Sequence, residues 1–140
     1  MSWNFTTSCY VLKCDIRRFF ASVDHDIFLS ILEKHITDES IRDFLRIVVE
    51  SFDPEDRSRG IPLGNLTSQI FGNIYLDEFD QYLRHTLKIS EYIRYADDFV
   101  IFSQDKIILQ DILVQIQKFF SDHLKLELHP EKISIESIYS

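Results

Sequence analysis

Residues 92–102 read YIRYADDFVIF, in which two apolar runs flank the adjacent acids Asp97 and Asp98. These runs are rich in aromatic and β-branched residues, and they predict two strands, over 92–96 and 99–103. The two strands would form a hairpin that carries both acids at its tip. Neighbouring carboxylates repel each other, so this tip needs a group that stabilises its negative charge.

The composition predicts one folded domain, residues 1–140, because 45% of the residues are apolar and the length suits a single core. The 15 basic and 23 acidic residues give a net charge of −8, which argues against unaided binding to nucleic-acid phosphates. Cys9 and Cys14 would face opposite sides of a strand, so we expect no disulfide and a cytoplasmic location. No apolar run reaches transmembrane length, and we expect no membrane partner.

Apolar periodicity predicts an α+β fold for the whole chain. Asp24 and Asn65 precede apolar stripes with helical spacing and are the expected helix caps. The predicted strands are 10–16, 92–96, 99–103, 124–128 and 132–136. One predicted helix follows Asp24, and three others cover 41–52, 66–87 and 105–123. This order favours an antiparallel sheet with helices packed on one face.

A third acid, Asp15, ends the first predicted strand on the face that also carries Lys13. If this strand lies beside the hairpin, Asp15 meets Asp97 and Asp98 at one end of the sheet. Carboxylates gathered in this way suit Mg²⁺, and two such ions support in-line phosphoryl transfer. The alternative for each acid alone is an ordinary turn or helix-capping residue, since aspartate is common in turns.

Four segments occur in a fixed order along the chain: CDIRRFFASVDH at 14–25, RGIPLGNLTSQ at 59–69, YADD at 95–98 and LELHPEK at 126–132. Together they resemble the motifs of a reverse transcriptase palm, and the resemblance runs from about residue 10 to the end. It implies the polymerase palm fold, in which helices pack on one face of an antiparallel sheet.

The resemblance implies that Asp15, Asp97 and Asp98 are the catalytic residues. Asp15 and Asp97 would be the principal ligands of two Mg²⁺ ions, with Mn²⁺ as an alternative metal. Asp98 would be a weaker ligand or an electrostatic neighbour, and the carbonyl of Ile16 would be a backbone ligand.

The resemblance also implies nucleotide-binding residues. Phe20 would lie against the sugar and exclude a 2′-hydroxyl, or else it is a core aromatic beside Phe19. Gly64 would let the backbone approach the nucleotide, unless it is a plain turn glycine. Gln69 is a candidate contact to template or nucleotide. Lys132 would protonate or neutralise the pyrophosphate, and a solvated strand lysine is the alternative.

Two positions favour one branch of the family. Intron and retron enzymes usually have proline at the position of Gln69. A glutamine there resembles the enzymes of diversity-generating retroelements and some related bacterial types. Leu63, a further predicted nucleotide contact, replaces a glutamine that helps to hold the incoming nucleotide. Loss of that polar contact would loosen base discrimination. Ala96 in YADD is frequent in intron-type enzymes and departs from the methionine that is common in the favoured branch.

The implied function is transfer of a nucleotide from a dNTP to a primer 3′-OH on an RNA template. The expected partners are template RNA, a DNA or RNA primer, dNTP and an accessory protein. Only nine residues precede Tyr10, so we expect the fingers and thumb to be largely absent and the fragment to be inactive alone. The alternatives are a degenerate palm that acts as a nucleic-acid-binding or regulatory module, and a nucleotide cyclase, for which no GGDEF-like sequence is present.

Overall fold

The four strands of the computed structural model form one antiparallel sheet in the order β2-β3-β1-β4. The structure describes residues 9–52, 58–62 and 65–138. The strands are β1 (Cys9–Asp15), β2 (Tyr92–Tyr95), β3 (Asp98–Ser103) and β4 (Ser134–Ile138). The hairpin strands β2 and β3 are adjacent, as predicted, and β1 lies between β3 and the C-terminal strand β4.

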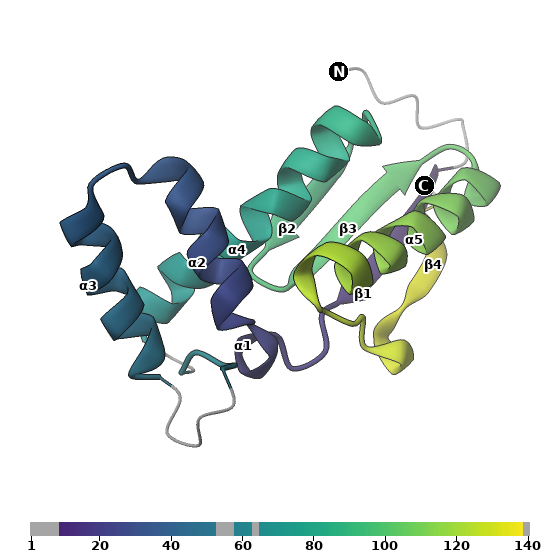
Figure 1. Cartoon of the computed structure of the whole chain (residues 1–140). Helices are drawn as coiled ribbons and strands as arrows, with labels where there is room; N and C mark the ends of the chain where they lie inside the picture. Colours follow the sequence, from purple (N-terminus) through teal and green to yellow (C-terminus); the bar gives the residue numbers. More distant parts are fainter. Residues whose placement is uncertain (1–8, 53–57, 63–64, 139–140) are drawn as a thin grey trace.

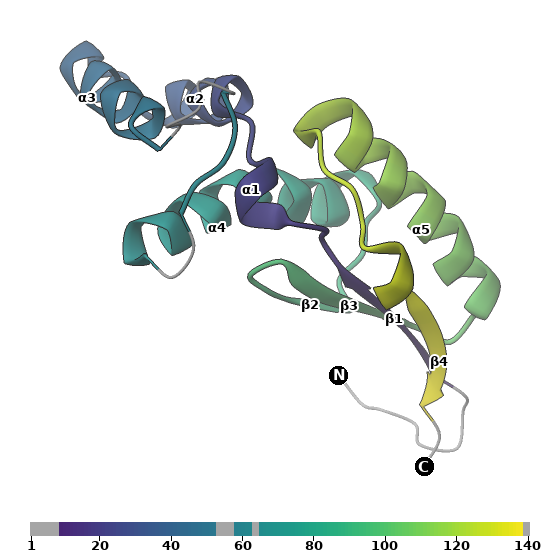
Figure 2. The same ribbon diagram turned by 90° about the horizontal axis from the view of Figure 1, so that it is seen from below.

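The two longest helices, α4 and α5, cover one face of this sheet (Figures 1 and 2). The helices are α1 (Phe19–Ser22), α2 (His25–His35), α3 (Glu39–Glu50), α4 (Leu66–Gln81) and α5 (Lys106–Phe119). Single π-helical turns extend α4 over Tyr82–Thr86 and α5 over Phe120–Leu124. Asp24 and Asn65 cap α2 and α4 as predicted, because each side chain accepts a hydrogen bond from a backbone N–H of its helix.

Alternation along the strands separates a covered face of the sheet from an open one. Leu12, Cys14 and Phe99 point toward the helices and are buried, whereas Lys13 and Asp15 lie on the opposite face. Figure 2 shows that the described helices leave this second face uncovered. The predicted α+β architecture, with helices on one face of an antiparallel sheet, is confirmed.

Aromatic side chains join the helices to the sheet and to one another. Phe79 of α4 packs against Phe99 of β3, with ring centroids 4.9 Å apart, and against Phe120 at 4.7 Å. The hydroxyl of the buried Tyr75 donates to the Leu124 carbonyl at 2.6 Å. The same ring packs on Phe28 of α2, so α2 and the end of α5 are both fixed to α4.

The strand predicted over 124–128 is wrong. Leu124 belongs to the π-helical turn, and Lys125 has a φ of 52°, which turns the chain out of the helix. Only Leu128 pairs with the sheet, through an isolated bridge to Ile16. A short 3₁₀ helix over Pro130–Lys132 then interrupts the pairing before β4 begins.

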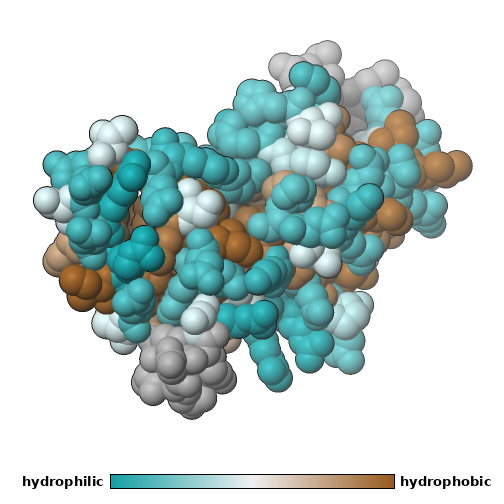
Figure 3. Space-filling view, in the orientation of Figure 1, coloured by the Kyte–Doolittle hydropathy of each residue, from teal (hydrophilic) through white to brown (hydrophobic). Residues whose placement is uncertain are grey.

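The apolar stripe predicted for 41–52 is only partly buried. Val49 of α3 is fully buried, but Ile41, Phe44 and Ile47 are 49%, 64% and 65% exposed. Figure 3 shows apolar surface over this helix, whereas polar residues cover much of the rest of the same view. None of the helices in the described part of the chain is long and apolar enough to cross a membrane.

Candidate metal and nucleotide site

Pairing of β1 with β3 brings the three predicted acids together at one end of the sheet. Asp15 lies directly opposite Asp98 in the register, and Asp97 belongs to the two-residue turn between β2 and β3. The Ile16 N–H donates to the Asp97 carbonyl at 3.1 Å and ties this turn to the end of β1. One carboxylate oxygen from each of the three aspartates lies within 4.8 Å of the others.

The folded chain disfavours the ionised forms of Asp97 and Asp98. Burial raises the pKa of Asp97, and the nearby negative charge of Asp15 raises it further. Burial likewise raises the pKa of Asp98, together with a hydrogen bond to Asp15 and the charges of Asp15 and Asp97. In the absence of a cation, therefore, ionised Asp97 and Asp98 are less favourable in the folded chain than in water.

Lys132 supplies one positive charge to this cluster. Its ammonium group lies 3.0 Å from Oδ2 of Asp15, although the lysine side chain itself is largely exposed. The hydrogen bond to Asp15 and the charge of that carboxylate raise the pKa of Lys132 above its ordinary value. Lys132 consequently stays protonated at neutral pH, next to the predicted metal ligands.

The donor set fits a hard divalent cation. Mg²⁺ prefers carboxylate oxygens together with water and phosphate, and Mn²⁺ accepts the same ligands. Three carboxylates outnumber the single ammonium of Lys132, so the cluster retains negative charge that a cation would neutralise. That the carbonyl of Ile16 is a backbone ligand of the metal stays a prediction.

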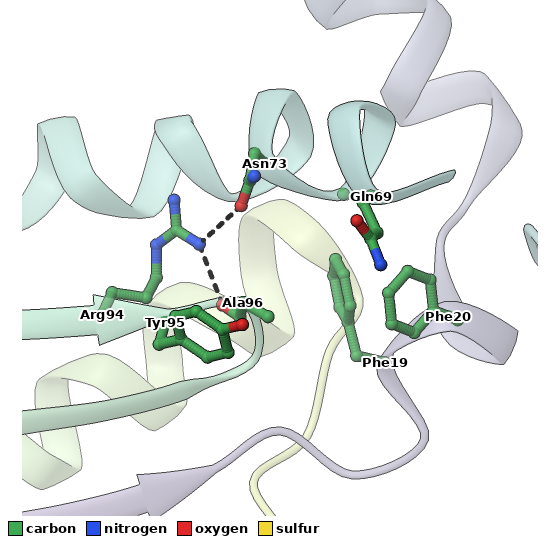
Figure 4. Close-up of a pocket in the computed structure, with 8 residues that line it drawn as sticks. Phe19, Phe20, Gln69, Asn73, Arg94, Tyr95 and Ala96 are labelled. Carbon is green, nitrogen blue, oxygen red and sulfur yellow. Dashed lines mark hydrogen bonds between the residues drawn. The ribbon is translucent and has the colours of Figure 1, made fainter. Parts of the chain in front are cut away.

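A cavity of about 520 Å³ adjoins the acid-bearing turn (Figure 4). It is lined by Phe19, Phe20, Gln69, Gly72, Asn73, Arg94, Tyr95 and Ala96. Two of the predicted nucleotide contacts, Phe20 and Gln69, thus face the same space. Phe19 is 2% exposed and belongs to the core, whereas the half-buried Phe20 offers part of its ring to the cavity.

The chain holds Phe20 in place from two sides. Its carbonyl accepts from the Ile61 N–H at 2.8 Å, within the second of the four motifs. On the other side α4 approaches closely at Gly72, where a Cβ would lie 3.7 Å from Phe20 Cε1 and 2.9 Å from Cε2 of the neighbouring Phe19. The predicted contacts Leu63 and Gly64 lie outside the described residues.

Six of the eight residues that line the cavity are not among the predicted nucleotide contacts, and they include Asn73, Arg94 and Tyr95. Asn73 follows Gln69 by four positions, so the two amides share one face of α4, a spacing that could have indicated Asn73. Tyr95 stands on the open face of the sheet and is 83% exposed. Nothing local in the sequence indicated that Arg94 would lie beneath α4.

The sequence matches, over residues 2–138, the family described as reverse transcriptase (RNA-dependent DNA polymerase). Among curated proteins it is 28% identical over 89 residues to the putative COX1/OXI3 intron 2 protein of Saccharomyces cerevisiae. This match covers 59% of this chain and 10% of that protein. It is also 28% identical over 87 residues to an uncharacterized 91 kDa protein in the cob intron of Schizosaccharomyces pombe, with 59% and 11% covered. The chain therefore spans about a tenth of the length of these relatives.

Solved telomerase structures share the fold at low sequence identity. Apo telomerase of Candida tropicalis, truncated from its C-terminal domain, gives a TM-score of 0.73 at 14% identity, over 96% of this chain and 31% of that one. Telomerase of Candida albicans in complex with a TWJ fragment of telomeric RNA gives 0.67 at 15% identity, over 91% and 27%. Because the family match spans nearly all of its residues, the chain belongs to the reverse transcriptase (RNA-dependent DNA polymerase) family.

Proposed function

We propose that the chain is the palm of an RNA-directed DNA polymerase, which transfers a nucleotide from a dNTP to a primer 3′-OH on an RNA template. The observation that carries this proposal is the convergence of Asp15, Asp97 and Asp98 beside a cavity lined by aromatic and amide side chains. Family membership supports the same activity. The partners would be template RNA, a DNA or RNA primer, dNTP and an accessory protein.

In this proposal the three aspartates hold two Mg²⁺ ions, or Mn²⁺ in their place. Asp15 and Asp97 are the principal ligands, and Asp98 adds negative charge beside them. Bound metal would stabilise the attacking and leaving oxygens of the phosphoryl transfer. Lys132, which stays protonated beside Asp15, would neutralise or protonate the pyrophosphate leaving group.

The residues of the cavity would select and orient the nucleotide. The ring of Phe20, whose backbone carbonyl accepts from the Ile61 N–H, would occupy the space that a 2′-hydroxyl needs and so favour deoxynucleotides. Gln69 would hydrogen-bond to template or nucleotide, and Leu63 and Gly64 would complete the contact. We further propose the branch of diversity-generating retroelements, with error-prone copying, on the strength of Gln69 and Leu63. The two matched curated relatives are intron proteins and do not add support for that branch.

The first prediction concerns the metal site. Asp97→Asn should weaken Mn²⁺ binding by about tenfold or more, because a neutral amide replaces a charged ligand. Isothermal titration of the 140-residue chain measures the affinity. The control is Asp43→Asn, which removes an exposed acid of α3 and should leave the affinity unchanged. Equal affinities for wild type and Asp97→Asn would disprove the assignment.

The second prediction follows from the raised pKa of Asp98. Since the pKa is higher in the folded chain than in the unfolded chain, ionised Asp98 lowers stability at neutral pH. Without metal, Asp98→Asn should raise the melting temperature at pH 7. This gain should disappear as the pH falls through the raised pKa and below the ordinary aspartate value of about 4.

Excess Mg²⁺ provides the complementary measurement for Asp98. Binding to the folded state should raise the melting temperature of the wild type more than that of Asp98→Asn. Thermal melts with EDTA and with Mg²⁺ therefore separate charge repulsion from ligation. A variant less stable than wild type in EDTA at pH 7 would contradict the proposed repulsion.

The third prediction tests Phe20. Phe20→Ala should bring the ratio of dATP to ATP affinity close to one, because it removes the ring that excludes the 2′-hydroxyl. Binding to the 140-residue chain in Mg²⁺ can be followed by NMR titration. Phe44→Ala removes an exposed ring on α3 and is the matched control. A wild-type chain without preference for dATP would refute the proposed selection.

The fourth prediction concerns the chain by itself. With a net charge of −8 it offers few cations to the phosphates of a primer–template, so we propose that it binds nucleic acid weakly and extends primers weakly or not at all. Extension of oligo(dT) on poly(rA) measures this directly. Robust extension at physiological salt would show that the proposal is wrong.

A further inference from the structure

Arg94 of β2 lies beneath α4 and forms a paired ionic contact with Asp80. Its Nε donates to Asp80 Oδ1 at 2.9 Å, and its Nη2 donates to Asp80 Oδ2 at 2.8 Å. Both side chains are only 11% exposed. Two parallel hydrogen bonds of this kind fix the plane of the guanidinium as well as its position.

The opposite edge of the same guanidinium reaches the acid-bearing turn. Nη1 donates to the carbonyl of Ala96 at 2.8 Å and to Asn73 Oδ1 at 3.2 Å, the two contacts drawn as dashed lines in Figure 4. A guanidinium has five N–H donors. Four hydrogen bonds to protein atoms leave one donor, so Arg94 is committed to the protein rather than held available for a phosphate.

Ala96 needs such support because of its backbone conformation. It is the first of the two residues between β2 and β3, and its φ is 53°. A side chain disfavours this left-handed region, and two-residue hairpins with positive φ at this place prefer glycine. A strained residue of this kind persists where its surroundings over-determine the conformation.

Asp97 follows Ala96 directly, and its peptide is held at two points. Arg94 binds the carbonyl that precedes Asp97, and the Ile16 N–H binds the carbonyl of Asp97 itself. We propose that Arg94 is a positioning residue that keeps the Ala96–Asp97 turn oriented toward Asp15. Asp80 is its counter-ion, and Asn73 accepts a further hydrogen bond from the Nη1 group that binds the Ala96 carbonyl. This inference rests on the proposed function, since the turn carries a proposed metal ligand.

A role confined to the packing of α4 on the sheet would have a different signature. Loss of Arg94 would then lower global stability, and the turn would be affected no more than the rest of the sheet. Glycine at position 96 would not compensate, because the backbone of the turn would not be the cause of the loss. The test therefore combines a change at Arg94 with one at Ala96.

Arg94→Lys keeps the positive charge near Asp80 but lacks the planar fork that reaches Ala96 at the same time. We expect about tenfold weaker Mn²⁺ binding by the 140-residue chain, which corresponds to about 1.4 kcal/mol. Hydrogen exchange of the Ile16 amide, followed by NMR, should accelerate more than exchange of the Leu12 amide within the preceding strand β1. The Ile16 amide, which donates to the Asp97 carbonyl, reports on the turn without any bound metal.

The double variant Arg94→Lys/Ala96→Gly should recover most of the Mn²⁺ affinity and of the Ile16 protection, because glycine adopts positive φ without a Cβ. Ile116→Val, in the fully buried core of α5, controls for general loss of stability and should accelerate both amides alike. Unchanged affinity and exchange in Arg94→Lys, or loss without recovery in the double variant, would overturn the proposal.

Asn73→Ala provides a second route should Arg94→Lys not fold, since Asn73 is exposed on α4. It should speed Ile16 exchange by about two- to threefold, the low end for one hydrogen bond. Unchanged exchange in this variant would count against the proposal. Absence of Mn²⁺ binding in the wild type would refute the proposed function instead, while the Ile16 amide would still test the positioning role.

Discussion

The antiparallel pairing of β1 with β3 places Asp15 opposite Asp98, and the convergence of the three acids depends on this register. A slip of one residue would move Asp15 to the face covered by α4 and α5, where an ionised carboxylate would be desolvated among apolar side chains. The buried residues Leu12 and Cys14 oppose such a slip, because it would expose them to solvent on the open face. Burial of apolar groups on one face thus determines where the acids stand on the other.

The site concentrates unfavourable features that the rest of the fold offsets. Asp97 and Asp98 have raised pKa values, and Ala96, directly before them, has a left-handed backbone. Capped helices and an aromatic cluster around Phe79 provide the stable frame to which that turn is attached. Strain and charge repulsion are typical of functional sites, where geometry is maintained by neighbours rather than by local preference.

Much of the site could be read from the sequence because its residues carry local signals. Asp97 and Asp98 interrupt two apolar strands, Asp15 ends a third, and Asp24 and Asn65 precede apolar stripes as caps do. The reading failed at 124–128, where alternating residues predicted a strand. There the left-handed Lys125 and the proline after His129 limit the pairing to one bridge, at Leu128. It also failed on α3, because periodicity shows that a face is apolar but not what covers it.

The sequence by itself determined the fold class, the four motifs in their order and the acids that they carry, because strand alternation, helix capping and turn chemistry act between near neighbours. Only the tertiary structure decided which strand lies beside the hairpin, which ring meets the cavity and which groups brace the turn. Arg94 illustrates the difference: its partners Asp80 and Asn73 are 14 and 21 residues away and come from another element. Contacts of this kind depend on how α4 packs over the sheet, and no local pattern of residues specifies that packing.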